Sequence, residues 1–109
     1  MELTLTGFLH EATQIETLPN GKQFKRIIIK QPPRINQFGE KIGEENFYEV
    51  TIFGIDKIQQ FFEGSPSKAI EQGLAKLTCT CYVNGNRREY EGKKYHNIQL
   101  TYKSVKWII

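Results

Sequence analysis

The sequence predicts a mainly β protein, a small barrel of five strands with a short helix between the third and fourth strands. Two observations carry this prediction. Apolar and polar residues alternate with a period of two in five segments, which is typical of strands with one buried face. Between the third and fourth segments the apolar spacing changes to three and four, which is typical of a helix. The 109 residues fit one domain, 1–109, whose core needs no disulfide or metal ion.

The first segment, residues 2–15, alternates leucine with threonine and contains Gly7. A glycine inside a strand indicates a bulge or the close approach of another backbone, as barrel closure needs. Residues 18–22 then predict a tight turn, because Asn20 and Gly21 tolerate a positive φ. The residues that share the inner face of this strand are Leu3, Leu5, Gly7 and Leu9.

The second and third segments are 23–31 and 46–54, joined by a polar loop over 32–45. The second ends at two prolines, which cannot donate hydrogen bonds to a sheet. A loop as long as 32–45 is usually functional or mobile. The inner faces of the two strands are predicted to carry Ile27 and Ile29, and Tyr48, Val50 and Ile52.

The helix is predicted over 55–63, with a further helical turn over 67–72. A fourth strand over 74–90 and a fifth over 95–109 flank a turn at Glu91 and Gly92. Antiparallel hairpins with a helix at this position describe an OB-fold Greek-key barrel. The apolar residues of the helix are Ile55, Ile58, Phe61 and Phe62.

Composition and charge narrow the classes of function. The net charge of +3 is compatible with nucleic acid without requiring it. The sequence has no glycine-rich phosphate loop, no His-Glu-x-x-His and no Gly-x-Ser-x-Gly, so we predict neither an enzyme nor a cofactor. It also has no signal peptide and no apolar run long enough for a membrane helix, which predicts a cytoplasmic protein with no membrane partner.

The two cysteines, Cys79 and Cys81, would point to the same face of the fourth strand. Two thiols make an incomplete zinc site, and a disulfide between such near neighbours would be strained. We therefore interpret both as small buried apolar residues in a reducing compartment, with no metal site.

The outer faces of the second and third strands carry the candidate binding residues. An exposed aromatic ring stacks on any base, a contact worth about 1–3 kcal/mol, and neighbouring cations meet phosphates. The alternative is that the two third-strand phenylalanines pack under the loop or against another subunit. The candidates are Phe24, Arg26 and Lys30 on the second strand, and Phe47 and Phe53 on the third.

A second candidate cluster spans the hairpin between the fourth and fifth strands, a loop that OB folds use for ligands. Cations and tyrosines alternate there, as expected for a clamp on a single strand. Glu89 and Glu91 dilute the charge, so a solvated hairpin tip is an equal alternative. The candidates are Arg87, Arg88, Tyr90, Lys93 and Lys94.

Three segments together resemble the bacterial and phage family of single-stranded DNA-binding proteins. They are Leu-Thr-Gly-Phe-Leu at 5–9, Leu-Pro-Asn-Gly at 18–21, and Phe-Tyr-Glu-Val-Thr-Ile-Phe-Gly at 47–54. The resemblance implies sequence-tolerant binding of single-stranded DNA in replication, recombination or repair, by a homodimer or homotetramer associated with the nucleoid. It places Phe47 and Phe53 at stacking positions of the family and Tyr90 close to a third.

Four features bear on this resemblance. Glu49 stands where the family often has arginine, and a carboxylate there repels phosphate. Residues 65–73 resemble an insertion, and the chain ends at Trp107, Ile108 and Ile109 where the family carries a flexible acidic tail. The segment 87–95 also resembles small OB domains of the Bacteroidetes type.

Two questions stay open at this point. Stacking and phosphate contacts serve DNA and RNA alike, so RNA is a second possible ligand. The alternative function is a protein-interaction module, whose exposed aromatic face binds a partner or another copy of the chain.

Overall fold

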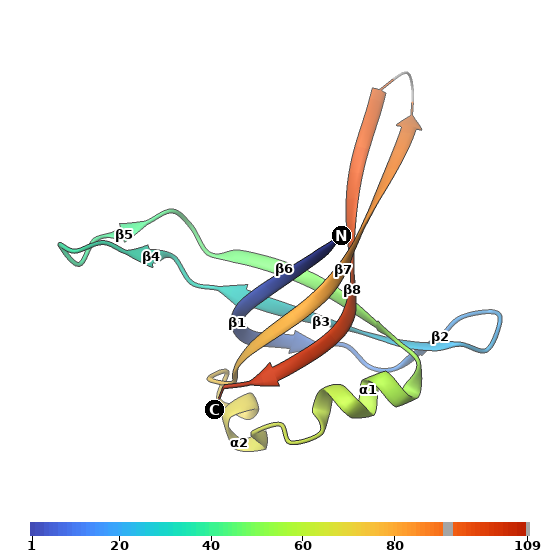
Figure 1. The fold of residues 1–109 in the computed structure, drawn as a ribbon, viewed down its shortest axis with the longest axis horizontal. Coiled ribbons are helices and arrows are strands. Elements are labelled where there is room, and N and C mark those ends of the chain that lie inside the picture. Colours follow the sequence, from blue (N-terminus) through green and yellow to red (C-terminus); the bar gives the residue numbers. More distant parts are fainter. Residues whose placement is uncertain (91–92, 109) are drawn as a thin grey trace.

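The computed structural model describes residues 1–90 and 93–108, although the side chains of 85–90 and 93–98 are outside the description. Long strands dominate these residues, and two short helices lie between the sixth and seventh strands (Figure 1). The elements are β1 (Glu2–Ala12), β2 (Glu16–Thr17), β3 (Gln23–Gln31), β4 (Arg34–Ile35), β5 (Lys41–Ile42), β6 (Asn46–Phe53), α1 (Ile55–Phe62), α2 (Ser67–Glu71), β7 (Lys76–Tyr90) and β8 (Lys93–Trp107).

Five of the strands close into a barrel. In the order β1-β7-β8-β6-β3 each strand pairs with the next, and β3 pairs again with β1 to complete the ring. β6 and β8 are parallel, whereas the other neighbours are antiparallel. This closed sheet confirms the predicted five-stranded OB barrel, with β2 added to the edge of β3.

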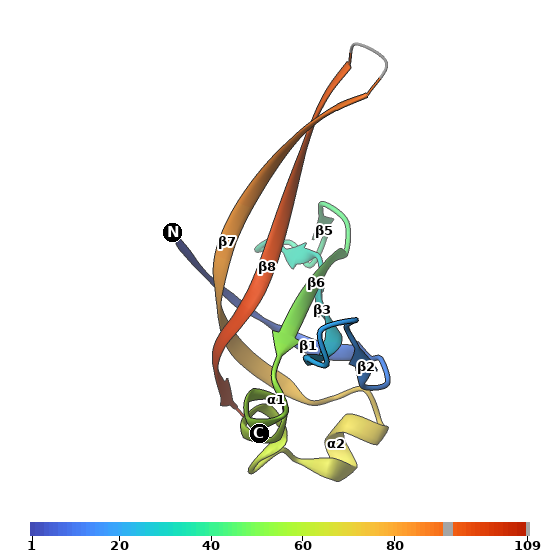
Figure 2. The same cartoon turned by 90° about the vertical axis from the view of Figure 1, so that its right-hand side faces the viewer.

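The inner faces of the strands make the core as the alternation predicted. Ile27, Ile29, Val50 and Ile52 are fully buried. α1 lies across one end of the barrel (Figure 2) and inserts Phe61, also fully buried, into it. The ring of Phe61 contacts those of Tyr102 and Trp107, and the Trp107 indole Nε1 donates a hydrogen bond to the Phe61 carbonyl at 2.9 Å.

β1 changes partners along its length, and Gly7 lies at the change. Residues 2–8 pair with β7, and residues 8–12 pair with β3 across a bulge between Leu9 and Glu11. A Cβ at Gly7 would lie 2.5 Å from the Lys30 carbonyl oxygen, which is far inside van der Waals contact. The close backbone approach predicted from this glycine is therefore confirmed.

Cys79 and Cys81 are free and fully buried, as predicted, with their Sγ atoms 3.7 Å apart. The sulfur contact with Cys81, together with burial, raises the pKa of the Cys79 thiol well above its ordinary value. The Cys79 thiol is therefore protonated, and both cysteine side chains are part of the apolar core. Within the described residues no helix is long and apolar enough to cross a membrane.

Several details differ from the sequence expectations. The last two strands begin at Lys76 and Lys93 rather than at residues 74 and 95. β1 ends at Ala12 rather than at residue 15. Leu3, expected on the inner face, is 38% exposed and lies before the residues of β1 that pair with β3 and close the barrel. The 32–45 loop contains a two-stranded hairpin, β4–β5, closed by the Asn36 side chain. Its Oδ1 accepts hydrogen bonds from the backbone N–H groups of Phe38 and Glu40, a local contact that the loop's polar composition did not reveal.

Candidate nucleic-acid interface

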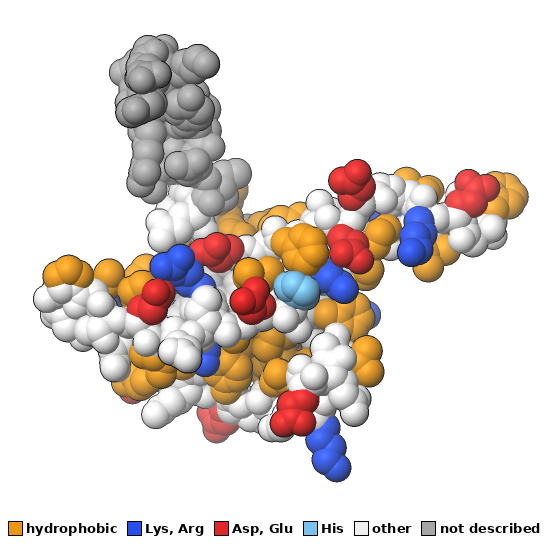
Figure 3. Space-filling view, turned by 180° about the vertical axis from the view of Figure 1, so that it is seen from behind, with side chains coloured by type: hydrophobic (Ala, Val, Ile, Leu, Met, Phe, Trp, Pro, Cys, Tyr) orange, Lys and Arg blue, Asp and Glu red, His pale blue; other side chains and the backbone are white. Residues whose placement is uncertain are grey.

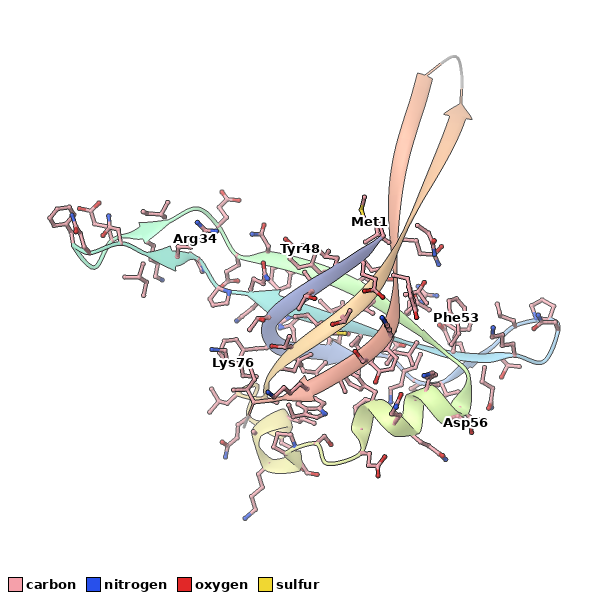
Figure 4. All side chains as sticks on the ribbon, in the orientation of Figure 1. Met1, Arg34, Tyr48, Phe53, Asp56 and Lys76 are labelled. Atoms are coloured by element: carbon pink, nitrogen blue, oxygen red, sulfur yellow. The ribbon has the colours of Figure 1, made fainter. Side chains whose placement is uncertain are left out.

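The pairing of β3 with β6 brings the predicted residues of both strands onto one outer face. Directly opposite residues in an antiparallel pair lie on the same side of the sheet. Phe24 is opposite Phe53, and Lys30 is opposite Phe47. Figure 4 shows Tyr48 and Phe53 toward the two ends of β6. The face therefore has a Phe53 end and a Phe47 end, about 20 Å apart at the strand rise.

A groove of about 460 Å³ lies at the Phe53 end. This volume is within the range of about 300–1,000 Å³ that is usual for ligand pockets. β3 and β6 form its floor, β8 one side, and the turn after β2 the other. The lining residues are Leu18, Phe24, Arg26, Glu49, Thr51, Phe53, Gln99 and Leu100.

Two aromatic rings lie side by side in this groove. The centroids of Phe24 and Phe53 are 6.0 Å apart, with the rings tilted by 42°. Lys22 Nζ lies 5.2 Å from the Phe53 centroid, and Arg26 Cζ lies 5.5 Å from that of Phe24. Aromatic rings flanked by cations can stack on a base and meet its phosphate. Sequence reasoning missed Lys22, although its place in the tight turn beside the second strand was a usable signal.

Arg26 is held between two carboxylates. Its guanidinium lies 3.2 Å from a Glu16 oxygen and 3.8 Å from a Glu49 oxygen. All three side chains are 43–57% exposed, so these ion pairs are weak surface contacts of about 0–1 kcal/mol each. The predicted phosphate ligand is thus orientated by its neighbours, and a phosphate would have to compete with them.

The Phe47 end of the face has a different character. Phe47 is 53% exposed, which opposes the alternative that the loop covers it, and its ring lies 5.1 Å from that of His10. Lys30, opposite, lies 4.0 Å from a Glu45 oxygen. A smaller, mainly apolar hollow of about 300 Å³ adjoins this end and is lined by Leu3, Phe47, Tyr48, Glu49 and Leu100.

Charges of both signs are mixed over this side of the molecule. The view from behind shows acidic and basic side chains interspersed with hydrophobic ones along the strands rather than one basic patch (Figure 3). This mixture agrees with the ion pairs of Arg26 and Lys30. The face consequently offers aromatic surface with local cations, and no broad positive field.

The second predicted cluster is placed through its backbone alone. β7 and β8 pair as far as Tyr90 and Lys93, and together they extend well beyond the barrel (Figure 2). The side chains of the five predicted residues are outside the described part of the structure. These residues are Arg87, Arg88, Tyr90, Lys93 and Lys94.

The β4–β5 hairpin is a further exposed element that the sequence prediction did not single out. It extends away from the barrel on the side opposite β2 (Figure 1). Phe38, at its tip, is 75% exposed, and Ile35 and Ile42 are 69% and 53% exposed. The sequence signal for it was a pair of dipeptides, Arg34-Ile35 and Lys41-Ile42, each with one charged and one apolar residue.

No protein-family model and no curated sequence matches the chain. Several solved structures do match the chain. The mitochondrial single-stranded DNA-binding protein Rim1 of S. cerevisiae is 19% identical with a TM-score of 0.67, covering 99% of this chain and 94% of Rim1. A Plasmodium falciparum SSB in complex with ssDNA is 8% identical with a TM-score of 0.59, covering 99% and 93%.

A small single-stranded DNA-binding protein from Streptomyces coelicolor is 11% identical with a TM-score of 0.57, covering 98% of this chain and 93% of that one. At these identities the likeness is one of fold. The coverage shows that it extends over nearly the whole of each chain. The chain therefore has the five-stranded OB fold in the form shared by these single-stranded DNA-binding proteins.

Proposed function

We propose that the protein binds single-stranded nucleic acid, DNA in the first instance, in the groove on β3 and β6. The observation that carries the proposal is the adjacency of Phe24, Phe53 and Arg26 in one groove, with Lys22 beside the Phe53 ring. Proteins with the same fold supply independent support, because they are single-stranded DNA-binding proteins and one was solved with ssDNA.

In this proposal the bases stack and the backbone is held by cations. Phe24 and Phe53 receive bases in the groove, and Phe47 receives another farther along the strand, at about 1–3 kcal/mol per base. Lys22, Arg26 and Lys30 take phosphates, together with the cations of the β7–β8 hairpin. Stacking tolerates any base, so most of the bound strand is recognised without regard to sequence.

The proposed role is one of binding, without catalysis or a cofactor, in replication, recombination or repair in the cytoplasm. The whole length 1–109 acts as one OB-fold unit in this proposal. Assembly into a homodimer or homotetramer would place several grooves along one nucleic-acid strand. Binding at one groove would then raise the effective concentration of that strand at the others, and with it the overall affinity.

Fluorescence anisotropy of labelled oligo-dT tests the proposal, with a duplex of equal length and oligo-rU as comparisons. We expect binding to the single strands and little to the duplex. The logarithm of the affinity should fall with the logarithm of salt concentration by roughly 0.7 per phosphate neutralised. Equal binding to duplex and single strand, or no binding at low salt, would contradict the proposal.

A second candidate function, protein interaction or self-assembly, is favoured by the edge of β1. Residues 2–7 pair with β7 on one side, and no strand in the described part of the chain pairs with their other side. A free strand edge is a template for another strand. Sedimentation at several concentrations tests this, with Leu3→Lys expected to weaken any association.

A further inference from the structure

Glu49 is the residue of the groove that stacking and phosphate binding do not explain. It lines the groove beside Arg26, and its side chain is 57% exposed. A carboxylate repels phosphate, so its presence in a site for the DNA backbone is unfavourable. It is a strong hydrogen-bond acceptor, however, and base edges carry N–H donors.

Glu49 and Arg26 together offer an acceptor next to a donor. The Glu49 carboxylate has two oxygens, and the Arg26 guanidinium 3.8 Å away has several N–H groups. Phe24, 5.5 Å from the guanidinium carbon, extends the arrangement with a ring on which a base can stack. Thr51, opposite Arg26 on β6, also lines the groove.

Guanine is the base whose edge matches this arrangement. Its Watson–Crick edge presents two adjacent donors, N1–H and the N2 amino group, which can meet the two oxygens of one carboxylate, and beside them the acceptor O6, which can meet a guanidinium. In a single strand this edge is free of a pairing partner. Adenine, cytosine and thymine each present an acceptor next to their donor, and that acceptor would face the Glu49 carboxylate.

We propose that the groove selects guanine at one position of the bound strand, with Glu49 accepting from N1–H and N2 and Arg26 donating to O6. The inference rests on the proposed function and adds a base preference to it. The base stacks on Phe24, Arg26 contacts this base instead of a phosphate, and the rest of the strand is bound without preference. Thus a carboxylate that opposes phosphate binding becomes the group that reads the base.

The competing explanation is that Glu49 merely orientates Arg26. Glu16 supplies a matched control, because it approaches the same guanidinium more closely, at 3.2 Å, yet is not part of the groove lining. If orientation were the purpose, Glu16→Gln and Glu49→Gln should have similar effects on base preference. If Glu49 reads the base, Glu49→Gln alone should change the preference.

The test compares short oligo-dT strands that carry one central dG, dA, dC or deoxyinosine, by competition against labelled oligo-dT. A single dG excludes quadruplex formation. We expect dG to improve binding roughly fivefold or more over the dA and dC strands, since a two-point contact to a base edge discriminates by at least this much. Deoxyinosine lacks the N2 amino group and should lose part of the gain.

The variants sharpen the result. Glu49→Gln should abolish the dG preference and strengthen binding to oligo-dT, because the carboxylate that repels phosphate is gone. Glu16→Gln should keep the preference. Equal affinity of the wild-type protein for all four substituted strands, or for dG and deoxyinosine, would overturn the inference and leave single-strand binding intact. Absence of binding to oligo-dT itself would instead overturn the proposed function. An rG in oligo-rU, tested in parallel, shows whether the preference extends to RNA.

Discussion

The inner and outer faces of β3 and β6 are built from alternate residues of the same two strands, yet they differ in almost every property. On the inner face Ile27, Ile29, Val50 and Ile52 are fully buried. The outer face carries phenylalanines, cations and carboxylates, most of them half exposed. Because a strand alternates its side chains, neighbouring residues in the chain serve two separate purposes.

This difference means that stability and binding should be separable by substitution. Changes on the inner face should unfold the barrel, and changes on the outer face should alter ligand affinity in a protein that still folds. A substitution on one face that changed both the stability of the barrel and its affinity for ligand would show that the two faces are not independent.

The largest effect is expected at Ile29. Ile29→Ala removes a fully buried side chain and leaves a cavity, which should lower the free energy of unfolding by about 2–5 kcal/mol. Ile28→Ala, on the opposite face of the same strand, is the control and should cost much less. Urea denaturation measures both variants. Similar losses in the two would show that β3 has no distinct inner face.

Gly7→Ala should be the next most damaging change, although it adds one methyl group. The new Cβ would meet the Lys30 carbonyl oxygen at 2.5 Å, and neither backbone can move without disturbing the pairing of β1 with β3. We expect a loss of about 1–3 kcal/mol, as for other overpacked sites. Thermal unfolding measures this loss, with Thr4→Ala, a change at an exposed position of the same strand, as the control. An unchanged unfolding midpoint in Gly7→Ala would contradict the close approach of the two backbones.

The outer face is tested by Phe53→Ala and Phe47→Ala. Each removes one stacking ring, so oligo-dT affinity should fall by about 1–3 kcal/mol at Phe53 and by more than about 1 kcal/mol at Phe47. Leu74→Ala, an exposed apolar residue that lines neither the groove nor the Phe47 hollow, is the control. Anisotropy gives the affinity and urea denaturation the stability. Unchanged binding in either variant would remove that ring from the site.

The smallest effect at neutral pH concerns Tyr102, a polar residue on the inner side of β8. Burial, with a contribution from Cys79, raises the pKa of Tyr102 to about 12. In the unfolded chain its hydroxyl ionises near 10.0. The unfolded state therefore releases the proton first, so this contribution to stability is complete below pH 10 and declines as the pH rises toward about 12.

Urea denaturation at a series of pH values from neutral to alkaline measures this decline. Tyr102→Phe keeps the ring that contacts Phe61 and removes the titrating group, so its stability should depend less on pH in that interval. The Tyr102 hydroxyl is buried and has no hydrogen-bond partner among the described residues, so its loss should cost little at neutral pH. An identical pH dependence in the variant would contradict the assignment.

The positions of the strands and the helix along the chain, and the inner face of the strands, were predictable from the sequence, because periodicity and turn residues act locally. Gly7 even predicted a contact with a distant strand. The partners of Arg26 were not predictable: Glu16 precedes it in β2, and Glu49 reaches it through the β3–β6 register. The same holds for Lys22 above Phe53. Such pairs depend on which turn and which strand lie side by side, and alternation does not specify this.

The short pairing between β6 and β8 is a seam at which the barrel can open locally. In the described part of the chain these strands pair over Val50–Thr51 and Leu100–Thr101, whereas β3 and β6 pair along the whole of β6. Segments held by few backbone hydrogen bonds open locally at low free-energy cost. Thr51 and Leu100 also line the groove, so motion of this seam would change the groove's width and let it admit bases of different size. Hydrogen exchange should accordingly be faster at the seam than along β3, and it should slow when a strand is bound.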